Sequence, residues 1–257
     1  MELKMIHFVG AGPGAVDLIT VRGARLIREA DVIIYAGSLV NPDILQDAKP
    51  EARIFNSAYM TLDEVMNVMT EADAQGQNVV RLHTGEPSIY GAVREQMDLL
   101  DEKGIAYASC PGVSACFGAA ADLNLEFTLP GVSQTLIITR LAGRTPVPEA
   151  EQLKSLAAHK TSMAIYLSSG MLGQVSSELI AGGLSPDTPA ALVYKATWPE
   201  EKKIICTLDT LERTAQEHEI RSTAVVLVGD AVRHSGYERS RLYDPSFTTG
   251  FRKASVK

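Results

Sequence analysis

The sequence has few of the features that mark membrane, secreted or redox-active proteins. No run of 18 apolar residues occurs in its 257 residues, which excludes a transmembrane helix. Only three cysteines are present, Cys110, Cys116 and Cys206, and no Cys-x-x-Cys pair is found. We therefore expect reduced cysteines in a cytoplasmic protein. The first residues enter an apolar segment directly, so we also expect no signal peptide.

The sequence also lacks the histidine spacing of a metal site and the positive net charge of a nucleic-acid-binding protein. The five histidines show neither His-x-His nor His-x-x-x-His spacing, so we expect no protein-bound metal. The net charge of −7 argues against non-specific nucleic-acid binding, which depends on neutralising phosphates. An anionic small substrate is compatible with this charge if a local basic patch exists. The hydrophobic content of 46% and the chain length suit one large or two small globular domains.

The first half of the chain alternates between apolar strands and helices. Strands are expected at 5–10, 31–36, 52–56, 78–84 and 105–110. Helices are expected at 20–29, 42–47, 61–75 and 89–103. Near-continuous apolar strands that alternate with helices predict a parallel sheet covered on both faces.

The pattern starts again near Pro130 and Gly131. Strands are expected at 134–140, 162–168, 189–195, 203–208 and 223–229, and helices at 149–158, 171–181 and 209–218. The strands at 189–195 and 203–208 are too close in sequence for a parallel crossover, so this pair should be antiparallel. We predict an α/β fold with a parallel domain at 1–118, a mixed domain at 119–237 and an irregular tail at 238–257. A cofactor is expected in the cleft between the two domains.

A glycine loop, Gly-Ala-Gly-Pro-Gly-Ala at 10–15, follows the first strand and formally matches the dinucleotide pattern G-x-G-x-x-G/A. Pro13 lacks the N–H that a pyrophosphate cradle would use, and the next helix is expected only near Thr20. The second strand also ends without a carboxylate for a ribose. A nicotinamide-dependent oxidoreductase is therefore a secondary alternative. The favoured interpretation is a loop that lets backbone approach a bulky ligand, and an ordinary structural turn is the other alternative.

A second segment, 78–91, forms a strand and then breaks at Gly85, Glu86 and Pro87. This order places backbone polar groups and one carboxylate at the carboxyl end of a strand. Small ligands bind at that edge of open α/β sheets. An ordinary turn between a strand and a helix is the alternative.

Three motifs taken together resemble the tetrapyrrole methylases, S-adenosylmethionine-dependent enzymes of corrin and sirohaem synthesis. The motifs are 10–14 with 18–20, then 80–91, then 111–115, and the resemblance covers essentially the whole chain. Segments 139–149, 194–201, 242–245 and 251–252 are similar to the branch that methylates carbon 11 of precorrin-4 or cobalt-precorrin-4 in cobalamin biosynthesis.

The resemblance implies a two-domain methyltransferase that uses S-adenosylmethionine, releases S-adenosylhomocysteine and acts on a small tetrapyrrole. It also implies a homodimer, and neither a membrane nor a nucleic acid is expected as a partner. The implied cofactor-binding residues are Pro13, Thr84, Gly85, Glu86, Ile89, Ser114, Ala115, Leu167 and Ala196. For Ile89 and Leu167 the alternative is core packing, and for Ser114 it is capping of the following helix.

The sequence departs from the family pattern at two positions. Family members usually carry Gly-Asp-Pro at 85–87, where this chain has glutamate, Glu86, in the middle position. They usually carry an acidic residue at position 15, where this chain has Ala15. Glu86 is the single candidate for a catalytic carboxylate, and no general base is assigned. Alternative activities are methylation of another ring carbon, methylation of a macromolecule on the same fold, or binding without turnover.

The implied substrate carries several carboxylates, which arginine forks and lysine charges bind well. Arg140, Arg144 and Lys195 follow or end predicted strands and are the substrate-binding candidates. Solvated surface charge is the alternative for each of them. Arg81 lies inside a predicted strand, and a structural role is expected for it instead.

Overall fold

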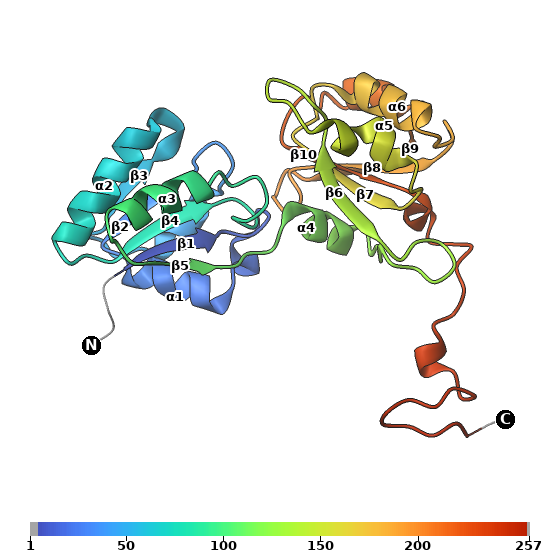
Figure 1. Ribbon diagram of the computed structural model, residues 1–257, viewed down its shortest axis with the longest axis horizontal. Helices are drawn as coiled ribbons and strands as arrows, with labels where there is room; N and C mark the ends of the chain where they lie inside the picture. Colours follow the sequence, from blue (N-terminus) through green and yellow to red (C-terminus); the bar gives the residue numbers. More distant parts are fainter. Residues whose placement is uncertain (1–4, 256–257) are drawn as a thin grey trace. The chain divides into compact units, whose positions relative to one another are not determined.

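The computed structural model describes residues 5–255, which form two compact units (Figure 1). The first unit contains the chain up to Asp122 together with Lys195–Glu201. The second contains Leu123–Tyr194 and the chain from Lys202 onward. A short segment of the second half of the sequence is thus built into the first unit, which a linear division of the chain does not anticipate.

The first unit is organised around a five-stranded sheet in the order β3-β2-β4-β1-β5. Every neighbouring pair is parallel. The strands are β1 (Ile6–Gly10), β2 (Val32–Tyr35), β3 (Arg53–Asn56), β4 (Val79–His83) and β5 (Tyr107–Cys110). Gly10 pairs with His83, so the carboxyl ends of β1 and β4 lie side by side. All five residues of β4 are buried, as expected for a central strand with helices on both faces.

Helices cover both faces of this sheet, which confirms the predicted parallel layer (Figure 1). One face packs through Phe8 and Ile34 against α2 (Leu62–Ala74) and α3 (Arg94–Glu102). The other face packs through Val9 and Ile33 against α1 (Val21–Glu29) and the 3-10 helix η2 (Pro42–Asp47). Further short elements complete the unit: η1 (Val16–Leu18), η3 (Ser57–Tyr59) and α4 (Ala115–Asp122).

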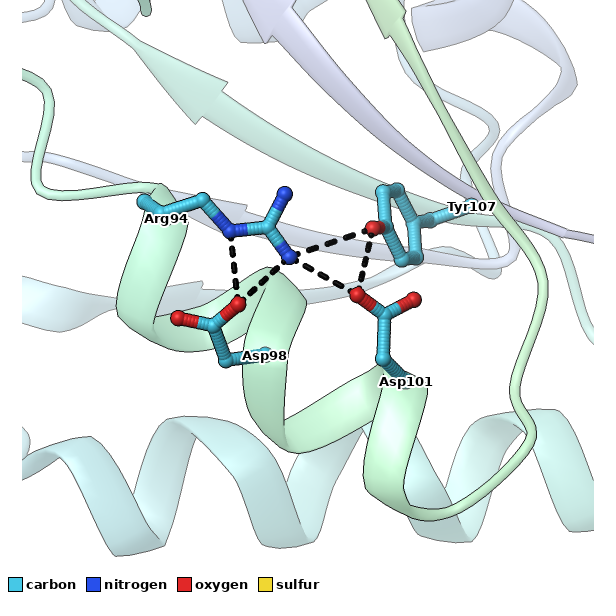
Figure 2. A network of polar contacts seen from close by, with 4 residues as sticks. All are labelled: Arg94, Asp98, Asp101 and Tyr107. Atoms are coloured by element: carbon cyan, nitrogen blue, oxygen red, sulfur yellow. Dashed lines mark hydrogen bonds and ion pairs between the residues drawn. The ribbon is translucent and has the colours of Figure 1, made fainter.

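Helix α3 begins at Arg94, five residues later than the predicted start at 89, so this boundary was wrong. The backbone angles explain this difference, because Tyr90 and Ala92 have φ values of +57° and +48°, which no right-handed helix allows. Figure 2 shows the polar contacts made by the first residue of the helix, Arg94. Its guanidinium bonds Asp98 at 2.7 Å and Asp101 at 2.8 Å, and it also contacts the Tyr107 hydroxyl on β5.

The second unit contains a mixed sheet in the order β6-β7-β10-β8-β9. Its strands are β6 (Leu136–Arg140), β7 (Ser162–Tyr166), β8 (Pro189–Tyr194), β9 (Lys202–Thr207) and β10 (Ala224–Val228). Strands β6 and β7 are parallel and the remaining pairs are antiparallel, including the predicted β8–β9 pair. Its core joins the sheet to α5 (Leu153–Ala157), α6 (Leu172–Ala181) and α7 (Leu211–Glu217).

Two further segments refine the expected pattern. The predicted helix at 149–158 is split into η4 (Glu149–Glu151) and α5, because Gln152 between them is extended. After η5 (Asp230–Arg233) the described chain contains one more short helix, η6 (Arg241–Tyr243). The Arg252 guanidinium organises this tail by donating to the carbonyls of Leu242 at 3.1 Å and Asp244 at 2.6 Å. None of the helices in the described range has the length and apolar character to cross a membrane.

Candidate functional site

Three loops meet backbone against backbone at the carboxyl ends of β1, β4 and β5. The Gly85 N–H donates to the Gly12 carbonyl at 2.8 Å, and the Gly12 N–H returns to the Gly85 carbonyl at 3.4 Å. Ala11 also donates to the His83 carbonyl at 2.7 Å. Gly12 and Gly85 thus form an isolated antiparallel bridge just beyond the parallel β1–β4 pair, and this bridge joins the two glycine loops.

Glycine is required where these loops cross. A Cβ atom on Gly10 would lie 2.5 Å from the Gly85 carbonyl oxygen and 2.6 Å from the Gly112 Cα. A Cβ on Gly112 would lie 2.7 Å from the Gly10 Cα and still closer to the Gly85 oxygen. These neighbours are backbone atoms, which cannot rotate away. Gly112 belongs to the 111–115 motif, yet sequence analysis did not select it as a site residue, because its requirement arises from a contact between distant loops.

The Glu86 carboxylate joins two of the loops. One oxygen accepts a hydrogen bond from the Ser88 N–H at 3.0 Å, and the other accepts from the Gly112 N–H at 2.8 Å. Hydrogen bonds from N–H groups to a carboxylate are stronger than those to a neutral acceptor. Both oxygens are therefore engaged in holding backbone, which gives Glu86 a structural task in the site. Its candidacy as a catalytic carboxylate stays a prediction.

The glycine loop is covered by the segment 195–198, which sequence analysis noted only in part. The Trp198 Nε1–H donates to the Pro13 carbonyl at 3.2 Å, and the Thr197 hydroxyl accepts from the Ala15 N–H at 2.9 Å. A Cβ on Gly14 would overlap the Trp198 ring. Ala15, where an acidic side chain is usual in the family, is thus anchored through its backbone.

The glycine loop does not open onto the N-terminus of α1. Helix η1 intervenes, and α1 starts after Thr20, whose hydroxyl caps it by accepting from the Gly23 N–H at 3.0 Å. Pro13 instead packs toward α4, where a Cβ on Gly118 would lie 2.8 Å from the Pro13 Cβ. This geometry lacks the helix N-terminus that a dinucleotide pyrophosphate uses.

The structure brings most of the predicted cofactor-binding residues into the first unit. They lie on the loops after β1, β4 and β5 and on the inserted segment: Pro13, Thr84, Gly85, Glu86, Ile89, Ser114, Ala115 and Ala196. Ser114 immediately precedes α4, and its carbonyl accepts from the Gly118 N–H at 3.2 Å, as expected for a residue at a helix start. Ala196 is buried and Ile89 is partly buried.

Leu167 lies in the second unit, directly after β7. Its φ is +53°, in the left-handed region that branched side chains rarely adopt, and its side chain is 62% exposed. An exposed leucine in a strained conformation is not explained by core packing, which was the alternative for this residue. Strained backbone of this kind is typical of ligand-binding positions.

The three substrate-binding candidates differ in the contacts that their charged groups make within the protein. The Arg140 guanidinium donates to the carbonyls of Thr145 at 3.1 Å and Pro146 at 2.6 Å, so it stabilises the loop that follows it. Arg144 lies exposed in that same loop. The Lys195 Nζ lies 5.0 Å from the Trp198 ring centre and 3.6 Å from a Glu200 oxygen. Within residues 5–255 no group of three His, Cys, Asp or Glu side chains is arranged to hold a metal ion.

A buried polar pair lies on β4 beneath the loop that follows it. Arg81 is 7% exposed, and burial lowers the pKa of its guanidinium to about 10. His83 is 4% exposed, stacks on Phe8, and its Nε2 has no hydrogen-bond partner. Burial, and secondly the Arg81 charge, lower the pKa of His83 to about 3. The imidazole is therefore neutral at physiological pH.

We predict that His83 makes the fold sensitive to acid. The unfolded chain binds a proton at this imidazole below about pH 6.5, whereas the native state binds it only near pH 3. Because the unfolded state holds more protons in this window, the contribution of His83 to the free energy of unfolding should fall on acidification, with a slope that approaches about 1.4 kcal/mol per pH unit below about pH 5.5. Denaturant unfolding at pH 7, 6 and 5 measures this slope. His83→Met, of similar volume, should remove that contribution, and parallel curves for the two proteins would contradict the prediction.

Comparison with known proteins places these features in one family. The family model described as Tetrapyrrole (Corrin/Porphyrin) Methylases matches residues 5–212. The chain is 49% identical over 254 residues to the cobalt-precorrin-4 C(11)-methyltransferase of Methanocaldococcus jannaschii, covering 99% of this chain and 98% of that protein. It is 41% identical over 239 residues to the precorrin-4 C(11)-methyltransferase of Mycobacterium tuberculosis, covering 93% of this chain and 95% of that protein.

Solved structures agree with the sequence comparison. A crystal structure of a cobalt precorrin-4 methyltransferase has a TM-score of 0.87 and 45% identity, over 89% of this chain and 95% of that one. A uroporphyrin-III C-methyltransferase from Thermus thermophilus, solved with S-adenosylhomocysteine, shares the fold with a TM-score of 0.75 at 23% identity, over 92% of this chain and 96% of that one. The matched model spans the whole parallel sheet and four of the five strands of the mixed sheet, all but β10, and the relatives are matched over nearly their whole length. The chain therefore belongs to the tetrapyrrole (corrin/porphyrin) methylases.

Proposed function

We propose that this protein is an S-adenosylmethionine-dependent C-methyltransferase that methylates carbon 11 of precorrin-4 or cobalt-precorrin-4 during corrin ring synthesis. The observation that carries the proposal is the match over nearly the full chain to relatives named for that reaction, at 41% to 49% identity. The joined loops after β1, β4 and β5 support it, because they form a pre-organised edge where a small ligand binds.

The donor set at this edge suits S-adenosylmethionine. The cosubstrate combines a flat adenine, a polar ribose and a charged amino acid group. Backbone N–H and C=O groups of the loops 84–89 and 112–115 supply polar contacts, and Gly85 permits close approach, since a Cβ there would meet nothing nearer than 3.6 Å. We infer that the predicted residues on these loops hold the cosubstrate here: Thr84, Gly85, Glu86, Ile89, Ser114 and Ala115.

S-adenosylmethionine supplies a methyl group on a sulfonium, whose leaving group is neutral. The task left to the protein is to position the acceptor carbon in line with that methyl group, which can supply on the order of 7–11 kcal/mol. Rigid loops serve this task, because a misplaced ligand loses much of the advantage. The Glu86 bridge between Ser88 and Gly112 is one device that makes these loops rigid.

We predict that Arg144→Ala weakens binding of the tetrapyrrole and leaves the affinity for S-adenosylhomocysteine nearly unchanged. Arg144 is exposed, whereas Arg140 in the same loop is committed to backbone carbonyls. Loss of one charge-assisted contact to a carboxylate should reduce affinity roughly tenfold. Titration of each ligand against wild type measures the effect, and Arg213→Ala on the exposed side of α7 is the matched control. Unchanged tetrapyrrole affinity would remove Arg144 from the substrate site.

The proposed reaction is tested by mass spectrometry of the product formed from precorrin-4, with and without cobalt. We expect a gain of one methyl group, located at carbon 11, and the two arms establish which form of the ring is the substrate. Methylation at another carbon, or no methylation with either form, would contradict the proposal.

We further propose that the protein is a cytoplasmic homodimer. The family resemblance supports this proposal, and analytical ultracentrifugation tests the oligomeric state.

A further inference from the structure

The loop between β4 and α3 is strained at the end that leads into the helix. Tyr90 and Ala92 both have left-handed backbone angles, and a Cβ on Gly91 would lie 2.9 Å from the Pro87 carbonyl carbon. L-amino acids adopt such angles at a cost, so the surrounding structure must hold them in place. At its start the loop is held by the Glu86 carboxylate, as described above. Its end therefore requires a separate support.

That support comes from the buried side of the sheet. The Gln96 Nε2 on α3 donates to the Ala92 carbonyl at 2.9 Å. The Oε1 of the same amide accepts from the Arg81 Nε at 3.1 Å. The Arg81 guanidinium also donates to the Ile34 carbonyl on β2 at 3.2 Å. A chain of hydrogen bonds thus runs from the centre of the sheet, through Gln96, to the strained backbone.

The orientation of the Gln96 amide is imposed by Arg81. A guanidinium only donates hydrogen bonds, so the amide must turn its oxygen toward Arg81 and its NH₂ toward Ala92. Gln96 is 4% exposed, so water does not compete for either contact. No carboxylate among the described residues forms an ion pair with Arg81, and its buried charge is therefore free to polarise the amide.

We propose that Arg81 and Gln96 are positioning residues: through the Gln96–Ala92 hydrogen bond they hold the 86–93 loop in the geometry that binds S-adenosylmethionine. The inference deepens the proposed function and rests on it for the identity of the ligand. Neither side chain needs to touch the ligand, because each acts through the backbone of the loop. The outer face of the same helix start is held independently by Arg94 (Figure 2).

The decisive variant is Gln96→Glu. The glutamate keeps an acceptor for Arg81 and strengthens it with a charge, but it has no N–H to donate to Ala92. A role confined to core stability predicts a protein at least as stable as wild type and unchanged in binding. The positioning role predicts equal stability with a loosened loop. Gln216→Glu, on the exposed face of α7, makes the same change of charge and is the matched control.

Three measurements are made on the full chain: denaturant unfolding, amide hydrogen exchange of residues 88–93, and titration with S-adenosylhomocysteine. For Gln96→Glu we expect an unfolding midpoint close to that of wild type, because the new ion pair with Arg81 offsets the lost contact with Ala92, and about tenfold weaker binding, the effect of one lost hydrogen bond. Exchange of residues 88–93 should rise by a similar factor. Exchange and affinity equal to those of the Gln216→Glu control would overturn the inference.

A second variant, Arg81→Met, keeps the inference testable if Gln96→Glu does not fold. Without the guanidinium, nothing forces the Gln96 amide to turn its NH₂ toward Ala92. Amide hydrogen exchange in the loop should therefore again rise, while the amides of β1 and β2 stay protected. Uniformly faster exchange across the first unit would instead indicate a general loss of stability and would overturn the inference. Failure of the wild-type protein to bind S-adenosylhomocysteine would contradict the proposed function, whereas hydrogen exchange of residues 88–93 would still decide whether Gln96 holds the loop.

Discussion

Gly112→Ala is expected to lower the free energy of unfolding by about 3 kcal/mol, near the upper end of typical overpacking costs. The added Cβ would lie 2.7 Å from the Gly10 Cα and even closer to the Gly85 carbonyl oxygen. Both neighbours are backbone, so the loops after β1, β4 and β5 must separate to admit it. Because the Gly112 N–H also donates to Glu86, the shift should break that bridge as well. Affinity for S-adenosylhomocysteine should fall on the order of 100-fold or more.

Gly104→Ala is the comparison variant for this experiment. Gly104 has a φ of +66°, a left-handed angle that Gly112 does not have, and nothing lies within 4 Å of the Cβ that alanine would add. Gly104→Ala therefore carries the cost of an unfavourable backbone angle alone, about 1–2 kcal/mol, whereas Gly112→Ala carries the steric cost alone. Denaturant unfolding and ligand titration on both variants separate the two effects. If Gly112→Ala bound the ligand as well as Gly104→Ala does, the three-loop crossing would not be part of the site.

Glu86→Gln should be the second most damaging change, because its amide replaces an acceptor by a donor. One oxygen can still accept from Ser88 or from Gly112, but the NH₂ group then faces the other backbone N–H. Loss of one charge-assisted hydrogen bond at this partly buried position should cost about 2 kcal/mol of stability, with a comparable loss in affinity for S-adenosylhomocysteine. Denaturant unfolding and titration at pH 7 measure both.

Glu86→Asp provides the graded control. Aspartate is the usual residue of the family at this position, and its shorter side chain can still accept from the N–H two residues ahead, at Ser88. We expect it to lose the contact with Gly112 and to give an intermediate result. An aspartate variant that binds more tightly than wild type would show that the longer side chain is not adapted to this bridge.

Sequence reasoning was accurate where the physical cause is local. The strands around Ile33 and Val80 are continuous apolar runs, which a doubly covered parallel sheet requires, and the structure confirms them. The short connection between β8 and β9 left antiparallel pairing as the one geometry available, and it was confirmed. The start of α3 was wrong, because the left-handed angles at Tyr90 and Ala92 depend on hydrogen bonds from Gln96 and its surroundings rather than on local propensity.

The residues of the candidate site also differ in whether the sequence alone could reveal their roles. Gly85, Glu86 and the glycine loop were recognisable because unusual residue types stand at strand ends, where ligands bind. The roles of Trp198 and Thr197 were not recognisable, since no local pattern indicates that a segment more than 180 residues away caps the glycine loop. The structure shows the Arg140 guanidinium donating to carbonyls of its own loop, which a basic residue in a sequence does not reveal, and its binding of substrate stays a prediction.

The sequence by itself determined the two sheets, the motifs at their strand ends and the family, because apolar periodicity, glycine breaks and motif order are properties of short segments. The tertiary structure alone decided which atoms those motifs touch. Gly10 and Gly112 are indispensable because a Cβ on either would meet the Gly85 carbonyl oxygen, and Glu86 is a bridge rather than a free carboxylate because the Gly112 N–H lies within its reach. Such contacts join residues far apart in the chain, and their distances are set by the packing of β1, β4 and β5.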